Sequence, residues 1–160
     1  MKRLEKGFSL IELLIVVAII LIIAAIAIPN LLRARMQANE ASAVSSIHAI
    51  NTAEISYSTL FPTVGVAPTL LSLGDGGSSP CPGTSVGGCF LDSNLESGSK
   101  AGYLFSYVQD NSVTPALHYT VNADPASRGI TGQRSFYSSD ANVTRYNTSV
   151  AASSSDSPLQ

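Results

Sequence analysis

The apolar positions of this chain are concentrated near its N-terminus. From residue 8 to residue 28, every residue is apolar or small except Ser9 and Glu12. As a helix, these roughly 21 residues would extend about 31 Å, which is close to the thickness of the hydrocarbon core of a bilayer. The pattern therefore predicts a helix that spans a membrane.

Beyond Pro29 the pattern changes to that of an amphipathic helix. Apolar residues recur three or four positions apart on one stripe, at Val44, Ile47, Ile50, Ala53, Tyr57 and Leu60. Pro29 removes a helical hydrogen bond, so we expect a kink or a loosening of the helix over residues 25–29. The two segments together predict one helix of roughly 50 residues, whose second half lies on a domain.

The rest of the chain reads as a long loop followed by strands. Residues 63–102 are rich in Gly, Ser and Pro, which favours a connecting loop. Strand-forming residues then occur in two pairs, 103–109 with 116–121 and 134–137 with 142–146, each pair separated by turn residues. We expect two antiparallel hairpins whose aromatic residues pack on the helix. The predicted fold class is α+β, with a long N-terminal helix packed on a small antiparallel sheet.

Composition and charge exclude several classes of function. Nine basic and eleven acidic residues give a formal net charge of −2, so nothing in the charge favours a nucleic-acid partner. The sequence contains no nucleophile with a base, no paired catalytic carboxylates, no phosphate-binding glycine loop and no zinc-ligand spacing. We therefore expect a protein that is not an enzyme and that binds no cofactor or metal.

Three basic residues, Lys2, Arg3 and Lys6, precede the apolar run. The positive-inside bias places this end in the cytoplasm and everything after Pro29 on the exported side. A secretory signal cleaved near residues 25–27 is the alternative. The apolar run is longer than the core of such a signal, however, and it contains an acidic residue.

The two cysteines, Cys81 and Cys89, lie in the exported part. An oxidising compartment allows a disulfide to persist, so we expect the two residues to be bridged. Their spacing is not that of a Cys-x-x-Cys redox motif. The bridge would therefore stabilise the loop, by about 2–3 kcal/mol in the chain-entropy picture.

Glu12 is the only ionisable residue between Lys6 and Arg33. Inserting a carboxylate at that depth costs about 2.5–3.5 kcal/mol unless something pairs with it. In one interpretation Ser9 and Glu12 form a capping box, in which the carboxylate reaches back to a free backbone N–H. In a second, Glu12 favours the positive end of the helix dipole. In a third, its partner belongs to another chain.

Residues 6–14, Lys-Gly-Phe-Ser-Leu-Ile-Glu-Leu-Leu, closely resemble the class III leader and N-terminus of type IV prepilins. The resemblance covers about the first third of the chain. It implies that a membrane-bound prepilin peptidase and N-methyltransferase cleaves between Gly7 and Phe8 and methylates the new amino terminus. It also implies that Glu12 of an incoming subunit pairs with the Phe8 amine of a neighbour in a filament.

What the resemblance implies for function is a structural subunit, a pilin, of a type IV pilus-like homopolymer. An assembly platform in the inner membrane and an ATPase motor would drive assembly. The precursor would lie in the inner membrane with its N-terminus in the cytoplasm, and the mature form in an extracellular pilus or a periplasmic pseudopilus. A type II secretion pseudopilin is the nearer alternative, and a helix-anchored periplasmic binding module the more distant one. Adhesion, motility, DNA uptake or electron transport would depend on the exposed surface.

Other polar residues have structural interpretations. Asp92, Asn94 and Glu96 begin like a calcium loop, but no bidentate acid follows at the required spacing, so a plain polar loop is favoured. His48 and His118 stand alone, without metal-ligand spacing.

Arg33 and Arg35 follow the apolar run. Their position favours a solvated anchor at the membrane surface. In a filament they would alternatively pair with Glu40 of another subunit.

The sequence thus divides into six segments. They are the leader 1–7, the transmembrane and filament-core helix 8–29, the amphipathic helix 30–61, the disulfide-stapled loop 62–102, the sheet 103–148 and a flexible tail 149–160.

Overall fold

The computed structural model describes residues 8–78 and 80–159. The predictions for the leader, which concern Lys2, Arg3, Lys6 and Gly7, lie outside the described residues. The chain divides into two compact units, Met1–Arg35 and Met36–Gln160. Each unit is described by itself below.

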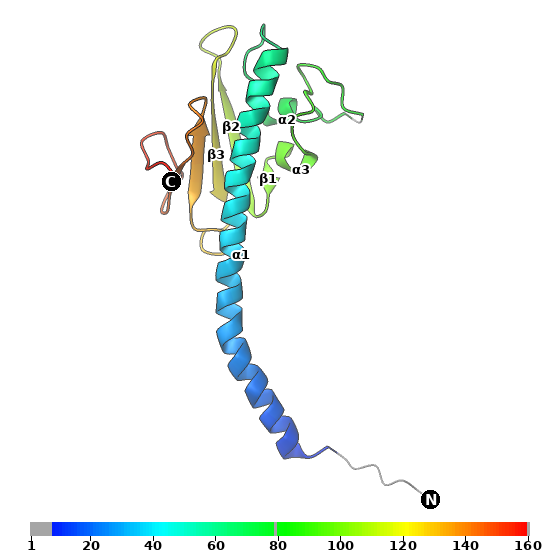
Figure 1. The fold of residues 1–160 in the computed structure, drawn as a ribbon, viewed down its shortest axis with the longest axis vertical. Helices are drawn as coiled ribbons and strands as arrows, with labels where there is room; N and C mark the ends of the chain where they lie inside the picture. Colours follow the sequence, from blue (N-terminus) through cyan, green and yellow to red (C-terminus); the bar gives the residue numbers. More distant parts are fainter. Residues whose placement is uncertain (1–7, 79, 160) are drawn as a thin grey trace, which may run out of the picture. The chain divides into compact units, whose positions relative to one another are not determined.

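A single helix, α1 (Leu10–Leu60), extends over 51 residues and contributes to both units (Figure 1). The predicted long helix is therefore confirmed. Pro29 lies inside α1 and the α conformation continues across it without interruption. A bend of the helix at this proline stays a prediction.

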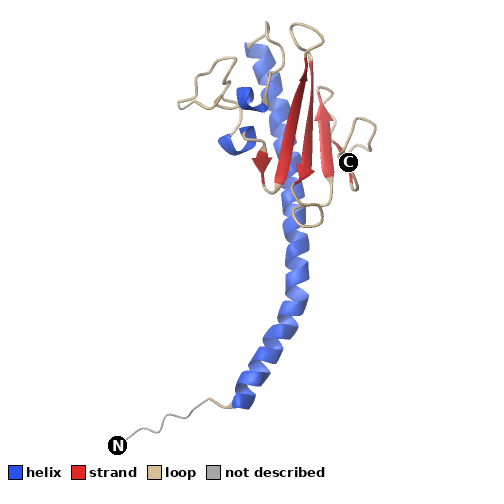
Figure 2. Cartoon of the chain, turned by 180° about the vertical axis from the view of Figure 1, so that it is seen from behind, coloured by secondary structure: helices blue, strands red, loops and turns tan. Residues whose placement is uncertain are grey.

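The second unit contains an antiparallel sheet in which each strand pairs with the next one along the chain (Figure 2). Its strands are β1 (Ser99–Lys100), β2 (Tyr103–Asp110), β3 (His118–Pro125), β4 (Ser135–Ser139) and β5 (Arg145–Asn147). Both predicted hairpins are present, β2 with β3 and β4 with β5. The α+β fold class is confirmed, with one short strand, β1, added at the edge.

One stripe of α1 packs against the inner face of this sheet. Ile47, Ile50 and Tyr57 are fully buried, together with Tyr103 and Phe136 of the sheet. The predicted stripe is right except at its end, since Leu60 is 63% exposed. The helix stops at that residue, and Phe61 packs against the core in its place.

The segment between α1 and the sheet is more ordered than a plain loop. It contains two short helices, α2 (Leu70–Leu73) and α3 (Ser93–Glu96), which are N-capped by Thr69 and Asp92. Leu73 and Leu95 are buried in the core. The predicted disulfide between Cys81 and Cys89 is present, with a Cα–Cα distance of 6.0 Å.

The C-terminal segment differs from the flexible tail that its polar composition predicts. The Asp156 side chain accepts hydrogen bonds from Asn147 Nδ2 at 2.9 Å and from the Ser153 N–H at 2.7 Å. Leu159 N–H donates to the carbonyl of Thr144 at 2.8 Å. These bonds hold the described part of the tail along the outer edge of β5, and they satisfy polar groups that would otherwise face water.

Candidate functional site

The surface of α1 in the first unit is apolar on all sides. The large apolar side chains from Phe8 to Leu32 are between 45% exposed, at Val17, and 80% exposed, at Leu10. A helix that is apolar all round is stable only where lipid or other protein covers it. This surface therefore requires a membrane, neighbouring helices, or each of them in turn.

By length and composition, α1 is the one helix in the described part of the chain that could cross a membrane. No residue of its most apolar window is buried inside the structure. The core helix of a soluble protein can be equally long and apolar, but most of its residues are buried. The predicted membrane-spanning segment thus has the surface that such a segment needs.

Glu12 lies in the first turn of this helix, where its carboxylate accepts a hydrogen bond from the Ser9 backbone N–H at 3.0 Å. The Ser9 carbonyl in turn accepts from the Leu13 N–H at 3.3 Å. The backward bond of the predicted capping box is therefore present. It occupies Glu12 Oε2, and within the described residues Oε1 receives no hydrogen bond. The local contact thus leaves half of the carboxylate available for a further partner.

Phe8 is the first described residue, and its side chain is 76% exposed. The structure places Phe8 and Glu12 at the same end of α1, which begins at Leu10. The cleavage point itself involves Gly7, which is outside the described residues. Processing between Gly7 and Phe8 therefore stays a prediction.

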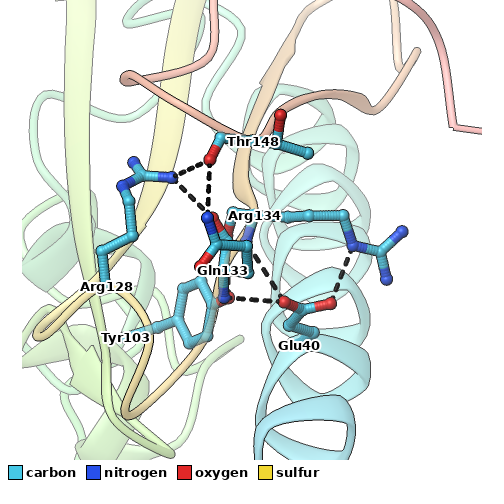
Figure 3. A network of polar contacts seen from close by, with 6 residues as sticks. All are labelled: Glu40, Tyr103, Arg128, Gln133, Arg134 and Thr148. Atoms are coloured by element: carbon cyan, nitrogen blue, oxygen red, sulfur yellow. Dashed lines mark hydrogen bonds and ion pairs between the residues drawn. The ribbon is translucent and has the colours of Figure 1, made fainter.

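A polar cluster in the second unit ties α1 to the loop before β4 (Figure 3). The Glu40 side chain accepts hydrogen bonds from the Gln133 N–H at 2.8 Å, the Arg134 N–H at 3.1 Å and Arg134 Nε at 2.7 Å. Burial alone would raise the pKa of Glu40, but the bonds from Gln133 and Arg134 outweigh it and hold that pKa below its usual value. Glu40 is therefore a buried, charged anchor.

This anchor corrects one hypothesis from the sequence. Glu40 is not free to pair with Arg33 or Arg35 of another subunit, because Arg134 of its own chain occupies it. Sequence reasoning missed this contact because the two residues are 94 positions apart. No local pattern signals a pair at that separation.

The same cluster extends to Thr148, the residue that follows β5. Arg128 Nη1 donates to the carbonyls of Gln133 at 2.6 Å and Thr148 at 3.1 Å, and Gln133 Nε2 donates to the Thr148 carbonyl at 3.1 Å (Figure 3). Tyr103 donates its hydroxyl to the Arg134 carbonyl at 2.7 Å. In each of these contacts a side chain donates to a backbone carbonyl of another part of the chain. The cluster therefore has a structural role.

The residues that resemble a calcium loop have other partners. Asp92 caps α3 and pairs with Lys100 at 2.8 Å, and Glu96 accepts from the Asp75 N–H at 2.6 Å. Among residues 8–78 and 80–159, no three or more His, Cys, Asp or Glu side chains are grouped to hold a metal ion. Asp92 and Glu96 thus have structural partners, in a segment that forms the short helix α3 rather than the plain polar loop that the sequence favours.

Comparison with known proteins gives similarity at the N-terminal end. The prokaryotic N-terminal methylation motif matches residues 2–28. The type IV wide pilus major component PilA4 of Thermus thermophilus is 68% identical over 38 residues, which cover 24% of this chain and 29% of that protein. The type IV major pilin protein PilA of Myxococcus xanthus is 43% identical over 71 residues, which cover 40% of this chain and 32% of that protein.

These matches span less than a third of the length of either relative. No solved structure matches the chain. The family motif places its similarity in residues 2–28, at the N-terminal end of the chain.

Proposed function

We propose that this chain is a structural subunit that polymerises into a type IV pilus-like filament. The proposal starts from the similarity of part of the chain to type IV pilins. The observation that carries the proposal is the surface of residues 8–32, which is apolar on all sides and exposed. It contains one carboxylate, Glu12, at its N-terminal end. Both relatives are named as pilus or pilin components, which favours a pilus over a secretion pseudopilus.

The apolar surface serves two environments in succession. Lipid tails are as apolar as leucine side chains, so moving the helix from a bilayer into a bundle of its copies changes its hydrophobic burial little. Association then depends on close packing. Small residues allow helices to approach closely, and the segment contains Ala18, Ala24, Ala25 and Ala27.

Glu12 supplies the alignment that apolar packing lacks. An ionised carboxylate in an apolar bundle is expensive unless it is paired. One of its oxygens is bound to Ser9 of its own chain, and the other would accept from the methylated amine of Phe8 in a neighbouring subunit. A buried pair of this kind has a narrow range of productive positions, so it fixes the register between two helices.

Assembly requires processing first. A prepilin peptidase would cleave between Gly7 and Phe8 while Lys2, Arg3 and Lys6 hold the junction at the cytoplasmic face. The membrane-bound precursor would have its second unit on the exported side, and an assembly platform with an ATPase motor would extract it into the filament. The chain itself would have no catalytic role.

The test is to compare Glu12→Gln with Glu12→Ala in cells that build the filament. Glutamine keeps an oxygen that can accept from the Ser9 N–H, as Glu12 does, but it removes the charge. If Glu12 aligns subunits by an ion pair, both variants lose filaments to a similar extent, while membrane-bound, cleaved subunit accumulates. Filament yield is measured by shearing and quantifying the released protein.

Normal filaments from Glu12→Gln would show that the residue only caps the helix. The matched control is Glu96→Gln in the second unit, whose carboxylate also accepts one backbone N–H. It is expected to assemble at the wild-type yield. Normal assembly of Glu96→Gln would show that a defect of the Glu12 variants comes from the apolar segment and not from the loss of any carboxylate.

A further inference from the structure

A second glutamate of α1, Glu54, is buried without a cation. It is 2% exposed, and none of the ion pairs among the described residues includes it. Its partners are the Ala67 N–H, which donates to Oε2 at 3.0 Å, and the Tyr107 hydroxyl, which lies 2.6 Å from Oε1. A buried carboxylate normally has a positively charged partner, so this environment needs an explanation.

The hydroxyl of Tyr107 faces two acceptors with one proton. It lies 2.6 Å from Glu54 Oε1 and 2.8 Å from the carbonyl of Ala67, and Ala67 is fully buried. If Glu54 is ionised, both oxygens compete for the proton, and a buried acceptor is left unpaired. If Glu54 is protonated, it donates to Tyr107 Oη, Tyr107 donates to the Ala67 carbonyl, and the Ala67 N–H donates to Glu54. Every group in the ring is then satisfied.

Apart from these two hydrogen bonds, the ionisable groups around Glu54 do not favour its charged form. Tyr57 of α1, Tyr107 of β2 and Tyr119 of β3 are phenols, and burial and the Glu54 carboxylate together raise the pKa of each. Asp140 lines the same hollow of about 160 Å³ as Glu54. Asp140 is itself 3.0 Å from His118 Nδ1. Of the residues that line this hollow, the charged one other than Glu54 is thus an acid whose own partner is His118.

Burial raises the pKa of Glu54 to about 7, in spite of the hydrogen bonds from Tyr107 and Ala67, which act in the opposite direction. The hollow opens the side chain to proton exchange with solvent. The residue therefore changes charge close to neutral pH, which an exposed glutamate does not do.

We propose that Glu54, Tyr107 and Ala67 form a pH-sensitive latch, closed when Glu54 is protonated and loosened when it is ionised. The latch fastens the segment that follows α1 onto the helix and the sheet. Gln109 Nε2, which donates to the Val66 carbonyl at 2.8 Å, and the Val66 N–H, which donates to the Ala116 carbonyl at 2.9 Å, hold the same segment without a titratable group. Ionisation thus loosens residues 64–70 locally and leaves the sheet intact.

The direction in which the strength of the latch changes with pH follows from the linkage between proton binding and opening. The folded form binds the Glu54 proton more tightly than the opened form does, so the latch is at full strength below pH 4.5 and weakens as the pH rises to about 7. Within that window, each pH unit increases the opening constant about tenfold. Above it the opening constant no longer changes.

The experiment is hydrogen–deuterium exchange of the full-length chain in detergent from pH 4.5 to 8.5, with rates corrected for intrinsic exchange chemistry. In the wild type, protection of residues 64–70 is expected to fall about tenfold per pH unit up to about pH 7 and then to level off. Glu54→Gln can form all three hydrogen bonds of the protonated acid, so its protection stays constant. A peptide from β3 serves as the internal reference.

The control variant is Glu96→Gln, which removes a partly exposed carboxylate that also accepts a loop N–H, from Asp75. It should keep the wild-type pH response. A wild type without a pH response, or a Glu54→Gln variant with the same response, would overturn the latch. Carboxyl carbon shifts of the labelled wild type give a measurement that needs no variant, because a Glu54 midpoint near 4.5 contradicts the proposal and one near 7 supports it.

Discussion

Replacing Glu40 by alanine tests how the second unit is held to its helix. The substitution removes the acceptor of three hydrogen bonds, from the Gln133 N–H, the Arg134 N–H and Arg134 Nε. It leaves a guanidinium and two backbone donors without their partner. Glu40→Gln is the matched variant, since its amide oxygen can still accept from both backbone N–H groups.

The size of the effect follows from exposure. Removing one member of a fully buried ion pair costs about 3–5 kcal/mol. The Arg134 side chain is 36% exposed, whereas that of Glu40 is 7% exposed, so water can solvate the released guanidinium. We therefore expect Glu40→Ala to lower the free energy of unfolding by about 2–3 kcal/mol. Glu40→Gln loses the screened charge pair and the hydrogen bond from Arg134 Nε, which water can replace at this partly exposed guanidinium, so we expect a loss of about 1 kcal/mol.

The assay is denaturant unfolding of the full-length chain in detergent, followed by the near-ultraviolet circular dichroism of its buried tyrosines. The core of the second unit contains three buried tyrosines, Tyr57, Tyr103 and Tyr119, and Tyr107 packs against it partly buried. The signal of these four side chains therefore reports on the second unit. A loss below about 0.5 kcal/mol for Glu40→Ala, the range of an ordinary surface substitution, would show that Glu40 does not hold the loop before β4 to the helix. An equal loss for both variants would show that charge rather than the two N–H bonds carries the anchor.

The pH dependence adds a check of sign. The pKa of Glu40 is lower in the folded chain than its usual value of 4.5. Its contribution to stability is therefore present above pH 4.5 and is lost as the pH falls through the folded pKa. The pKa of Glu54, on the same helix, is raised, so its contribution to stability is lost as the pH rises. The two glutamates act in different ranges, because Glu40 loses its contribution to stability below pH 4.5 and Glu54 loses its own between about pH 4.5 and 7.

Two further predictions concern the core and the disulfide. Ile47→Ala should cost about 2–5 kcal/mol in the free energy of unfolding, because Ile47 is fully buried, whereas Ile55→Ala, at a residue 58% exposed on the same helix, should cost less than about 1 kcal/mol; similar losses at both positions would contradict the observed helix face. Replacing Cys81 and Cys89 by serine should cost about 2–3 kcal/mol, measured by the same denaturation, and an unchanged midpoint would show that the bridge between them does not restrict the unfolded chain.

Much of the fold follows from local patterns in the sequence. The helix from Leu10 to Leu60 was predictable because apolar periodicity is a property of neighbouring residues. The two hairpins were predictable because turn residues separate strand-forming runs. At the functional end, the reach of Glu12 back to Ser9 followed from their spacing.

Other features depend on contacts between distant residues, which no local pattern specifies. The pair of Glu40 with Arg134 joins residues 94 apart, and the bond of Tyr107 to Glu54 joins residues 53 apart. The polar composition of the tail is typical of disorder, but Asp156 accepts hydrogen bonds from Asn147 and Ser153, which composition does not indicate. Composition records which groups are polar and does not record where their partners lie.

We propose that the chain enters a filament after its leader is removed, with its apolar helix as the shared core. The test is intact-mass analysis of subunits from sheared, purified filaments. The filaments are expected to contain this chain as a species that begins at N-methylated Phe8. Filaments without this chain, or a chain that begins at Met1 or Ile28, would contradict it.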